Sequence, residues 1–190
     1  MDPARIGIHG LSYGGLNALQ GLCRDAGLFA AGVANAPVFN WVSTLRFTKA
    51  PWVDYSPSLE GEAVITGPEP EFAGPSWHGK VDANIKTAWG ASPAAASAGL
   101  TVPLMLVHGD LDTNVDMQET MAVMRLQREA GREDDLEMVF LADEKHWPAL
   151  YETQMEVCGL TVDFFLRRLD QQQAGAGTGT SSSKLVGEAV

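Results

Sequence analysis

The chain has 190 residues, 45% of them hydrophobic, and its 13 Lys and Arg against 24 Asp and Glu give a formal net charge of −11. This size suits one globular domain, and the negative charge argues against nucleic acid as a partner because a phosphate backbone would be repelled. No apolar run approaches the roughly 20 residues of a membrane-spanning helix, and the N-terminus lacks the basic start and apolar stretch of a signal peptide, so the location of the protein stays open.

The first part of the chain is predicted to form a strand, a helix and a second strand. Residues 5–9 are a short β-rich run, 14–27 carry apolar residues at helical spacing with a glycine at the end, and 29–37 end at a proline. Residues 40–97 are rich in Pro, Gly and Trp, with short helices expected near 41–47 and 81–89. Since a structureless stretch of this length is unusual in a compact domain, we expect a folded excursion that carries function.

The second part of the chain continues the alternation of predicted strands and helices. Residues 103–109 are a continuous apolar run typical of a buried parallel strand, and residues 136–142 are predicted to form a further strand. Each is followed by a segment with helical periodicity, 117–130 and about 150–169. The sequence therefore predicts an α/β fold, with a parallel sheet and helices on both faces.

The end of the chain differs in composition from the rest. Residues 171–190 are mostly Gln, Gly, Ser and Thr, which predicts a disordered tail after a domain spanning 1–170. Cys23 and Cys158 both fall in predicted helices, where we expect small buried residues rather than a disulfide.

A serine lies at the first predicted strand-to-helix turn. The sequence GLSYG at 10–14 matches G-x-S-x-G, the nucleophile elbow of α/β-hydrolases. In such a turn Ser12 adopts a strained backbone conformation, and we expect glycine to be required on both sides, at Gly10 and Gly14, for lack of space. The turn raises the Ser12 hydroxyl above the sheet and directs the Tyr13 N–H at the oxyanion formed when a carbonyl is attacked.

A serine nucleophile needs a base and an acid that orients the base, and on this fold they follow in the order Ser, Asp or Glu, His. Asp112 comes three residues after the 103–109 strand. Asp110 and Asp116 lie in the same loop, but an aspartate at such a position more often stabilises a turn or caps a helix than acts as a catalytic acid. Asp112 is therefore the predicted acid.

The base is predicted from position in the same way. His146 follows the 136–142 strand, so it lies at the same sheet edge as Ser12 and Asp112. A structural role is predicted for the remaining histidines, which are His9, His78 and His108.

Four segments together resemble a known family. DPARIGIHGLSYGG, APVFNW, VPLMLVHGDLDTNVDMQ and DEKHWPALYE resemble, in order, the catalytic domain of the prolyl oligopeptidase family of serine peptidases, which includes dipeptidyl-peptidases and acylaminoacyl-peptidases. The resemblance covers roughly residues 2–169. It implies Ser12 as nucleophile, Asp112 as orienting acid, His146 as general base and Tyr13 as an oxyanion donor. It also implies a substrate-binding role for four residues near the pocket for the residue before the scissile bond: Val38, Trp41, Asn114 and Val115.

The chain has little sequence before its serine. In α/β-hydrolases about four strands precede the nucleophile, whereas here only MDPA precedes the first strand. We therefore expect the C-terminal part of a partial α/β-hydrolase fold, with its N-terminal strands missing. The exposed sheet edge would promote self-association, and loss of the loop that supplies the second oxyanion donor would weaken activity.

These patterns predict a serine-type peptidase that hydrolyses peptide substrates through an acyl-enzyme on Ser12. Two alternatives stay open: a carboxylesterase of the same fold, and a truncated, catalytically weak fragment that acts as an interaction module. No metal or organic cofactor is expected, since no cluster of His, Cys and carboxylates has ligand spacing.

Overall fold

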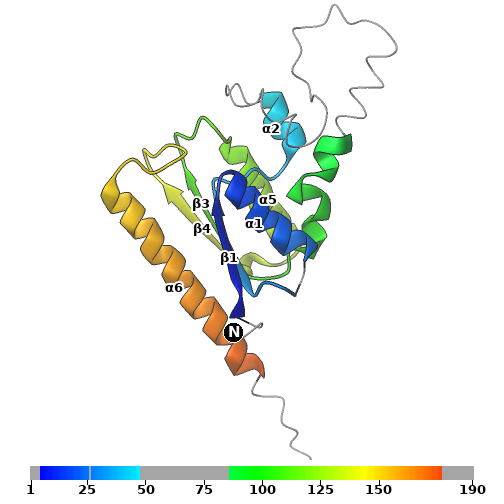
Figure 1. Cartoon of the computed structure of the whole chain (residues 1–190), viewed down its shortest axis with the longest axis vertical. Helices are drawn as coiled ribbons and strands as arrows, with labels where there is room; N and C mark the ends of the chain where they lie inside the picture. The colour runs from blue at the N-terminus through cyan, green and yellow to red at the C-terminus, as the bar shows by residue number, and fades with distance from the viewer. Residues whose placement is uncertain (1–4, 26, 48–85, 177–190) are drawn as a thin grey trace, which may run out of the picture.

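The computed structural model describes residues 5–25, 27–47 and 86–176. Within them, four strands form one parallel sheet in the order in which they occur along the chain. They are β1 (Gly7–Leu11), β2 (Ala31–Asn35), β3 (Leu104–Gly109) and β4 (Leu136–Leu141) (Figure 1). The parallel sheet is thus confirmed, although β1 begins and ends two residues later than the predicted 5–9.

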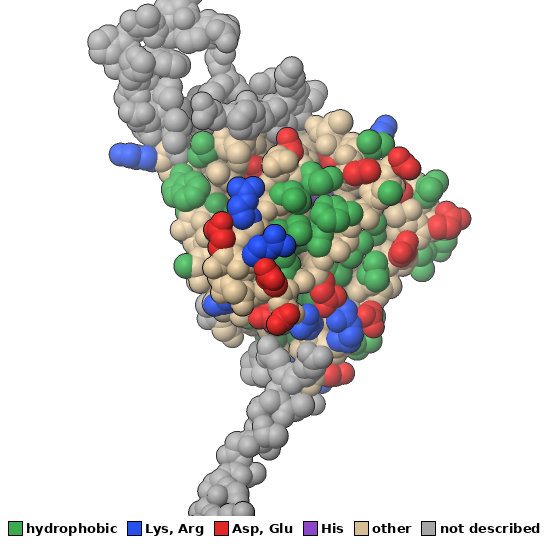
Figure 2. Space-filling model, turned by 180° about the vertical axis from the view of Figure 1, so that it is seen from behind, with side chains coloured by type: hydrophobic (Ala, Val, Ile, Leu, Met, Phe, Trp, Pro, Cys, Tyr) green, Lys and Arg blue, Asp and Glu red, His purple; other side chains and the backbone are tan. Residues whose placement is uncertain are grey.

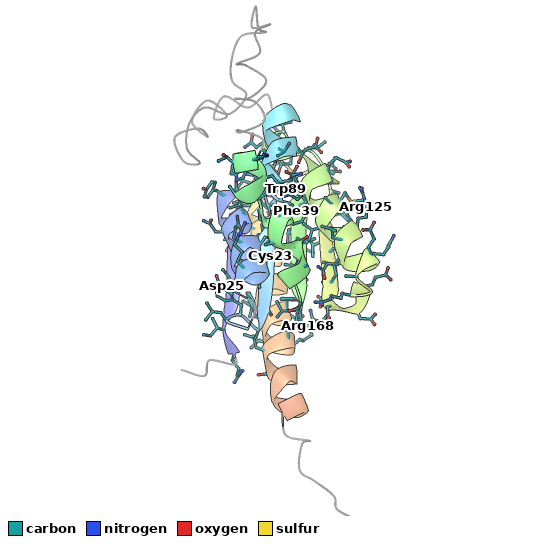
Figure 3. All side chains as sticks on the ribbon, turned by 90° about the vertical axis from the view of Figure 1, so that its right-hand side faces the viewer. Cys23, Asp25, Phe39, Trp89, Arg125 and Arg168 are labelled. Carbon is teal, nitrogen blue, oxygen red and sulfur yellow. The ribbon has the colours of Figure 1, made fainter. Side chains whose placement is uncertain are left out.

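Helices cover the sheet on two sides. They include the α-helices α1 (Tyr13–Arg24), α2 (Trp41–Phe47), α5 (Met117–Glu129) and α6 (Tyr151–Ala176), and the short 3₁₀ helices η3 (Pro93–Gly99) and η4 (Glu133–Asp135). Figures 1 and 3 show α1 and α5 on one side of the sheet and α6 on the other. Because parallel strands run the same way, their carboxyl ends, and the loops that follow them, meet at one edge of the sheet.

Two apolar clusters fill the space between the sheet and its helices. Alternate residues of β3 belong to different clusters, Leu104 and Leu106 on the side of α1 and α5, and Met105 and Val107 on the side of α6. Phe164 of α6 is fully buried in the second cluster. A strand that is apolar on both faces is expected when helices cover both, so the prediction of a two-sided arrangement is confirmed.

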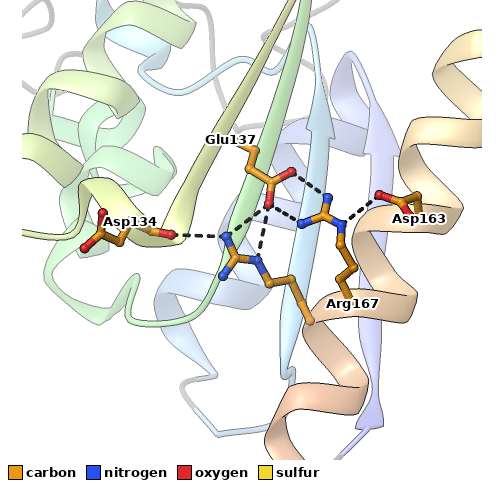
Figure 4. Close-up of polar contacts among 5 residues, drawn as sticks. Asp134, Glu137, Asp163 and Arg167 are labelled. Atoms are coloured by element: carbon orange, nitrogen blue, oxygen red, sulfur yellow. Dashed lines mark hydrogen bonds and ion pairs between the residues drawn. The ribbon is translucent and has the colours of Figure 1, made fainter.

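A network of charged side chains joins β4 to α6 (Figure 4). Glu137 accepts hydrogen bonds from Arg167 at 2.8 and 2.9 Å and from Arg168 at 3.0 Å. Arg167 also pairs with Asp163, and Arg168 donates to the Asp134 carbonyl. The hydrogen bonds from Arg167, above all, hold the pKa of the Glu137 carboxyl below its usual value. The network fixes the direction of α6 against β4 rather than adding much stability, because partly exposed pairs contribute only about 0.2–1 kcal/mol each.

The final helix is longer than predicted. It continues past Leu169 to Ala176, so residues 171–176, which were expected to be disordered, are helical. Helix propagation requires only one more hydrogen bond per residue once the earlier turns exist, and glutamine is a good helix former. Residues 177–190 of the predicted tail lie outside the described part of the chain.

Two other expectations are corrected in detail. Cys23 is buried, and burial raises the pKa of its thiol to about 11, but Cys158 is exposed on α6; both are unpaired. The predicted helix at 81–89 is described only from residue 86, where helix extends to residue 90, and η3 after it was not predicted.

The surface carries apolar as well as charged groups. Seen from behind, hydrophobic side chains gather near the middle of the face, bordered by charged ones (Figure 2). None of the helices that the structure describes is long and apolar enough to cross a membrane.

Candidate active site

Ser12 occupies the turn between β1 and α1. Its backbone has φ 58° and ψ −119°, a conformation that favours glycine and costs a side-chain-bearing residue about 1–3 kcal/mol. The Ser12 N–H donates to the Asn35 carbonyl at 2.8 Å, which fixes the turn to the neighbouring strand. Serine at a helix N-cap usually accepts a backbone hydrogen bond, but here the side chain makes no such bond. The Ser12 hydroxyl therefore does not cap the N-terminus of α1.

Glycine is required around this turn at positions that differ partly from the prediction. A Cβ on Gly10 would lie 2.1 Å from the Gly14 carbonyl oxygen, so this glycine is needed for the predicted reason. At Gly14, a Cβ would meet no described atom within 4 Å. The second close approach is at Gly15, where a Cβ would lie 2.9 Å from the Asn35 oxygen. The steric requirement therefore falls one residue later, where the helix first packs against the neighbouring strand.

Asp112 lies in the loop after β3 with its side chain fully buried. One oxygen, Oδ1, accepts from the backbone N–H groups of Asn114 at 2.8 Å and Val115 at 3.0 Å. The other, Oδ2, lies 2.7 Å from Nδ1 of His146 and 3.2 Å from Nε2 of His108. Four nitrogen atoms thus surround the carboxylate.

This environment determines the charge of Asp112. Burial alone would raise the pKa of its carboxyl, but the hydrogen bonds from His108, His146 and the two backbone groups outweigh burial and hold the pKa well below its usual range. A depressed carboxyl pKa stabilises the fold above the unfolded value of about 3.9, and that stabilisation is lost as the pH falls through the folded value. Asp112 is therefore a carboxylate at neutral pH.

His146 lies in the loop after β4, and its side chain is 18% exposed. Because an ionised carboxylate only accepts hydrogen bonds, Nδ1 of His146 carries the proton in the bond to Asp112. In the neutral ring Nε2 then has a lone pair. Among the described residues, Nε2 makes no hydrogen bond, so this nitrogen can accept a proton.

The loops that carry the acid and the histidine are held together by backbone contacts. The Leu111 N–H donates to the Glu144 carbonyl at 2.9 Å. A Cβ on Gly109 would lie 2.3 Å from the same oxygen and 2.4 Å from that of Lys145. The absence of a side chain at Gly109 therefore allows the histidine loop to cross close to the end of β3.

Ser12 lies at the same edge of the sheet, but no hydrogen bond between its hydroxyl and His146 occurs within the described part of the chain. Strained backbone is concentrated at this edge: among the residues that the structure describes, the non-glycine residues with positive φ are Ser12, Ala36 and Asp143, which follow β1, β2 and β4. Such strain persists where surrounding structure holds it, often at active sites.

The other aspartates of the loop after β3 and the other histidines, which were alternatives for the catalytic acid and base, have other roles or positions. Asp116 caps α5, its side chain accepting from the Gln118 N–H at 2.9 Å, while Asp110 is exposed. His9 lies on β1 beside a cavity, and His78 lies outside the described residues. His108 is buried and contacts Asp112, a contact that the sequence does not signal because it depends on how the loop after β3 folds back over the end of the strand.

The four residues expected near the substrate separate into two groups. Val38, Trp41 and Val115 are each at most 2% exposed and pack in one cluster with Leu16, which follows the serine turn on α1. The Tyr13 and Trp41 rings lie 5.9 Å apart. Asn114 is exposed. Contact of these residues with a substrate stays a prediction.

A cavity of about 360 Å³ lies beside His146, between β1, the histidine loop and α6. Its lining is mostly apolar and includes Leu11, Trp147 and Val157. No group of three or more His, Cys, Asp or Glu side chains that could hold a metal ion occurs in the described ranges.

Comparisons with known proteins agree with this architecture. The model of the prolyl oligopeptidase family matches residues 1–172, and the chain therefore belongs to this family. A probable dipeptidyl-aminopeptidase B from Colletotrichum graminicola is 36% identical over 130 residues, covering 65% of this chain and 11% of that protein. Dipeptidyl-peptidase 5 of Porphyromonas gingivalis is 26% identical over 147 residues, covering 77% and 19%.

Solved structures share the fold. Dipeptidyl peptidase 4 of Porphyromonas gingivalis matches 88% of this chain and 20% of its own with a TM-score of 0.66 at 26% identity. The acylaminoacyl peptidase of Pyrococcus horikoshii matches 88% and 24% with a TM-score of 0.65 at 20% identity. The described sheet and helices are thus part of an α/β-hydrolase fold, and the chain spans 11% to 24% of the length of these relatives.

Proposed function

We propose that this chain carries the catalytic residues of a serine peptidase that cleaves peptide bonds through an acyl-enzyme on Ser12. The observation that carries the proposal is the 2.7 Å hydrogen bond between Asp112 and His146, at the sheet edge where Ser12 occupies its strained turn. Membership of a peptidase family supports the same chemistry.

In the proposed reaction, His146 Nε2 takes the proton of Ser12 as its hydroxyl oxygen attacks the substrate carbonyl. Asp112 stabilises the resulting imidazolium, and the Tyr13 N–H donates to the oxyanion. The protonated His146 then gives its proton to the leaving amine, and water hydrolyses the acyl-enzyme by the same sequence of proton transfers. The bond between Ser12 and His146 forms when substrate binds, as is common where the ligand-free geometry is loose.

Three residues are proposed to shape the substrate pocket next to Ser12. Val38, Trp41 and Val115 share a cluster with the first turns of α1, so a change in any of them alters the surface beside the nucleophile. Asn114 is added as a polar contact, because its side chain is exposed and it lies two residues after Asp112, to which its backbone N–H donates.

The test is labelling of the whole chain with a fluorophosphonate, a reagent that phosphonylates activated serines. We expect label on Ser12, found by peptide mass spectrometry, and its loss in Ser12→Ala. Ser97→Ala, outside the site, is the matched control and should label like the wild type. Asp112→Asn should label on the order of 10³–10⁴ times more slowly, because it favours the wrong tautomer of His146.

Folded wild-type protein without label, or equal labelling of Ser12→Ala, would contradict the proposal and favour an interaction module. Amide and ester substrates with the same acyl group then distinguish a peptidase from a carboxylesterase. A peptidase hydrolyses both, whereas an esterase hydrolyses only the ester.

A further inference from the structure

A second, buried histidine contacts the buried acid. His108 is the penultimate residue of β3 and is 1% exposed. Its Nε2 lies 3.2 Å from Asp112 Oδ2 and 3.1 Å from the Val115 carbonyl oxygen. Its Nδ1 lies 2.7 Å from the hydroxyl oxygen of Thr120 on α5.

These contacts select one tautomer of His108. The two oxygens near Nε2, from a carboxylate and a carbonyl, can only accept hydrogen bonds, so Nε2 must carry the proton. Nδ1 then has a lone pair, and the Thr120 hydroxyl is able to donate to it. The opposite tautomer would place a lone pair against both oxygens, so these two acceptors select the form, whereas the Thr120 hydroxyl can donate or accept.

The result is a chain of hydrogen bonds that ends at the proposed base. Thr120 donates to His108, His108 donates to Asp112, and His146 donates to the same carboxylate oxygen. His108 and His146 therefore hold Oδ2 from two directions while backbone N–H groups hold Oδ1. Rotation of the carboxylate would break bonds on both oxygens.

We propose that His108 and Thr120 are positioning residues of the reaction, Thr120 bonding to Nδ1 and orienting the His108 ring so that its Nε2–H holds the Asp112 carboxylate in line with His146. This inference rests on the proposed function and assigns to His108 more than the structural role predicted from the sequence. Neither residue touches the substrate; both act through Asp112.

The experiment measures the second-order rate constant for fluorophosphonate labelling of Ser12 in the whole chain. Thr120→Val keeps the shape of the side chain and removes its hydroxyl, and we expect labelling to slow about 10-fold. Thr120→Ser restores the hydroxyl and most of the rate. His108→Leu should slow labelling on the order of 10²-fold, the effect of a misplaced catalytic group, whereas His108→Gln retains a donor and recovers part of the rate. Thr101→Val, on an exposed loop, is the control with the wild-type rate.

The second readout is the tautomer itself, seen in ¹H–¹⁵N spectra of imidazole-labelled protein. We expect His108 as the Nε2–H form and a downfield Nδ1 proton on His146 that Thr120→Val shifts or broadens. A wild-type His108 with its proton on Nδ1, or wild-type labelling in both Thr120→Val and His108→Leu, would overturn the inference.

Failure of the proposed function gives a different result. If Ser12→Ala labels like the wild type, the nucleophile is wrong, and the two imidazole signals still decide whether His108 holds Asp112. If Thr120→Val does not fold, the comparison of His108→Gln with His108→Leu decides instead.

Discussion

Individual residues at the site carry backbone strain that the rest of the structure maintains. Ser12 has the clearest case, with φ 58° and ψ −119° and a hydroxyl that does not cap its own helix. A serine in this conformation costs stability, and its backbone geometry alone would be better satisfied by glycine. Under the proposed function, the strain is the consequence of exposing the nucleophile at a sharp turn.

The strain at Ser12 predicts that two substitutions which both remove the nucleophile differ in the stability of the fold. Ser12→Gly should be about 1 kcal/mol more stable than Ser12→Ala, because relief of the strain exceeds the extra entropy of glycine in the unfolded chain. Both variants should lose fluorophosphonate labelling. The measurement is urea unfolding at pH 7 followed by circular dichroism, and a Ser12→Gly variant less stable than Ser12→Ala would show that the turn is not strained.

Between elements, buried polar contacts decide how the segments at the site are held. Glu119 of α5 is 4% exposed, and its Oε2 accepts from the backbone N–H groups of Phe39 at 3.0 Å and Asn40 at 2.6 Å. Its Oε1 accepts from the Ser43 hydroxyl. One side chain on α5 thus satisfies the backbone at the start of α2, the helix that carries Trp41.

Removal of this carboxyl should destabilise the fold in a way that glutamine avoids. Glu119→Ala leaves the buried Phe39 N–H without a partner, at about 1–3 kcal/mol, and also removes the acceptor of the partly buried Asn40 N–H. Glu119→Gln retains an acceptor for both. Burial raises the pKa of the Glu119 carboxyl despite the hydrogen bond from Ser43 and those from the backbone.

The sign of the pH effect follows from this shift. A carboxyl with a raised folded pKa stabilises the fold most at low pH, and the contribution declines as the pH rises from about 4.3 through the folded value. The stability of Glu119→Gln relative to the wild type should therefore increase with pH over that range. Urea unfolding at several pH values measures it, and a difference that is constant with pH would mean that Glu119 is not the titrating group.

At the scale of the whole molecule, the two outer strands of the sheet, β1 and β4, differ in their surroundings. β4 carries the charged Glu137, which pairs with two arginines of α6, and charge on an edge strand disfavours strand pairing. At β1 the edge adjoins the apolar cavity and α6, where Val162 is 59% exposed. Self-association, expected from the sequence, is therefore predicted to occur through β1.

A proline on this strand should block such pairing. The Ile6 carbonyl and the Ser12 N–H bond to β2, so by the alternation of a parallel ladder the His9 N–H points away from β2. Light scattering after size exclusion should give a mass of at least twice 20.3 kDa for the wild type and for His9→Ala, and a monomer for His9→Pro. A monomeric wild type at micromolar concentration would exclude association through this edge.

Much of the architecture could be predicted from local patterns. The apolar run at 103–109 predicted a buried strand, because helices on both faces of β3 leave no polar side, and 136–142 predicted the strand β4, which carries Glu137 and is only partly buried. The GLSYG turn predicted the position of Ser12 between a strand and a helix. The length of α6 was underestimated because composition marked its last residues as a tail, although an existing helix extends at little cost.

The sequence by itself determined the order of strands and helices and the side of the sheet at which Ser12, Asp112 and His146 lie, since periodicity and chain direction are local properties. Only the tertiary structure decided which groups meet there. The contact of His108 with Asp112, the Glu119 bonds to α2 and the need for glycine at Gly15 rather than Gly14 depend on how a helix or loop sits against a neighbouring strand. Register and packing set those distances to within an ångström, and spacing along the chain does not encode them.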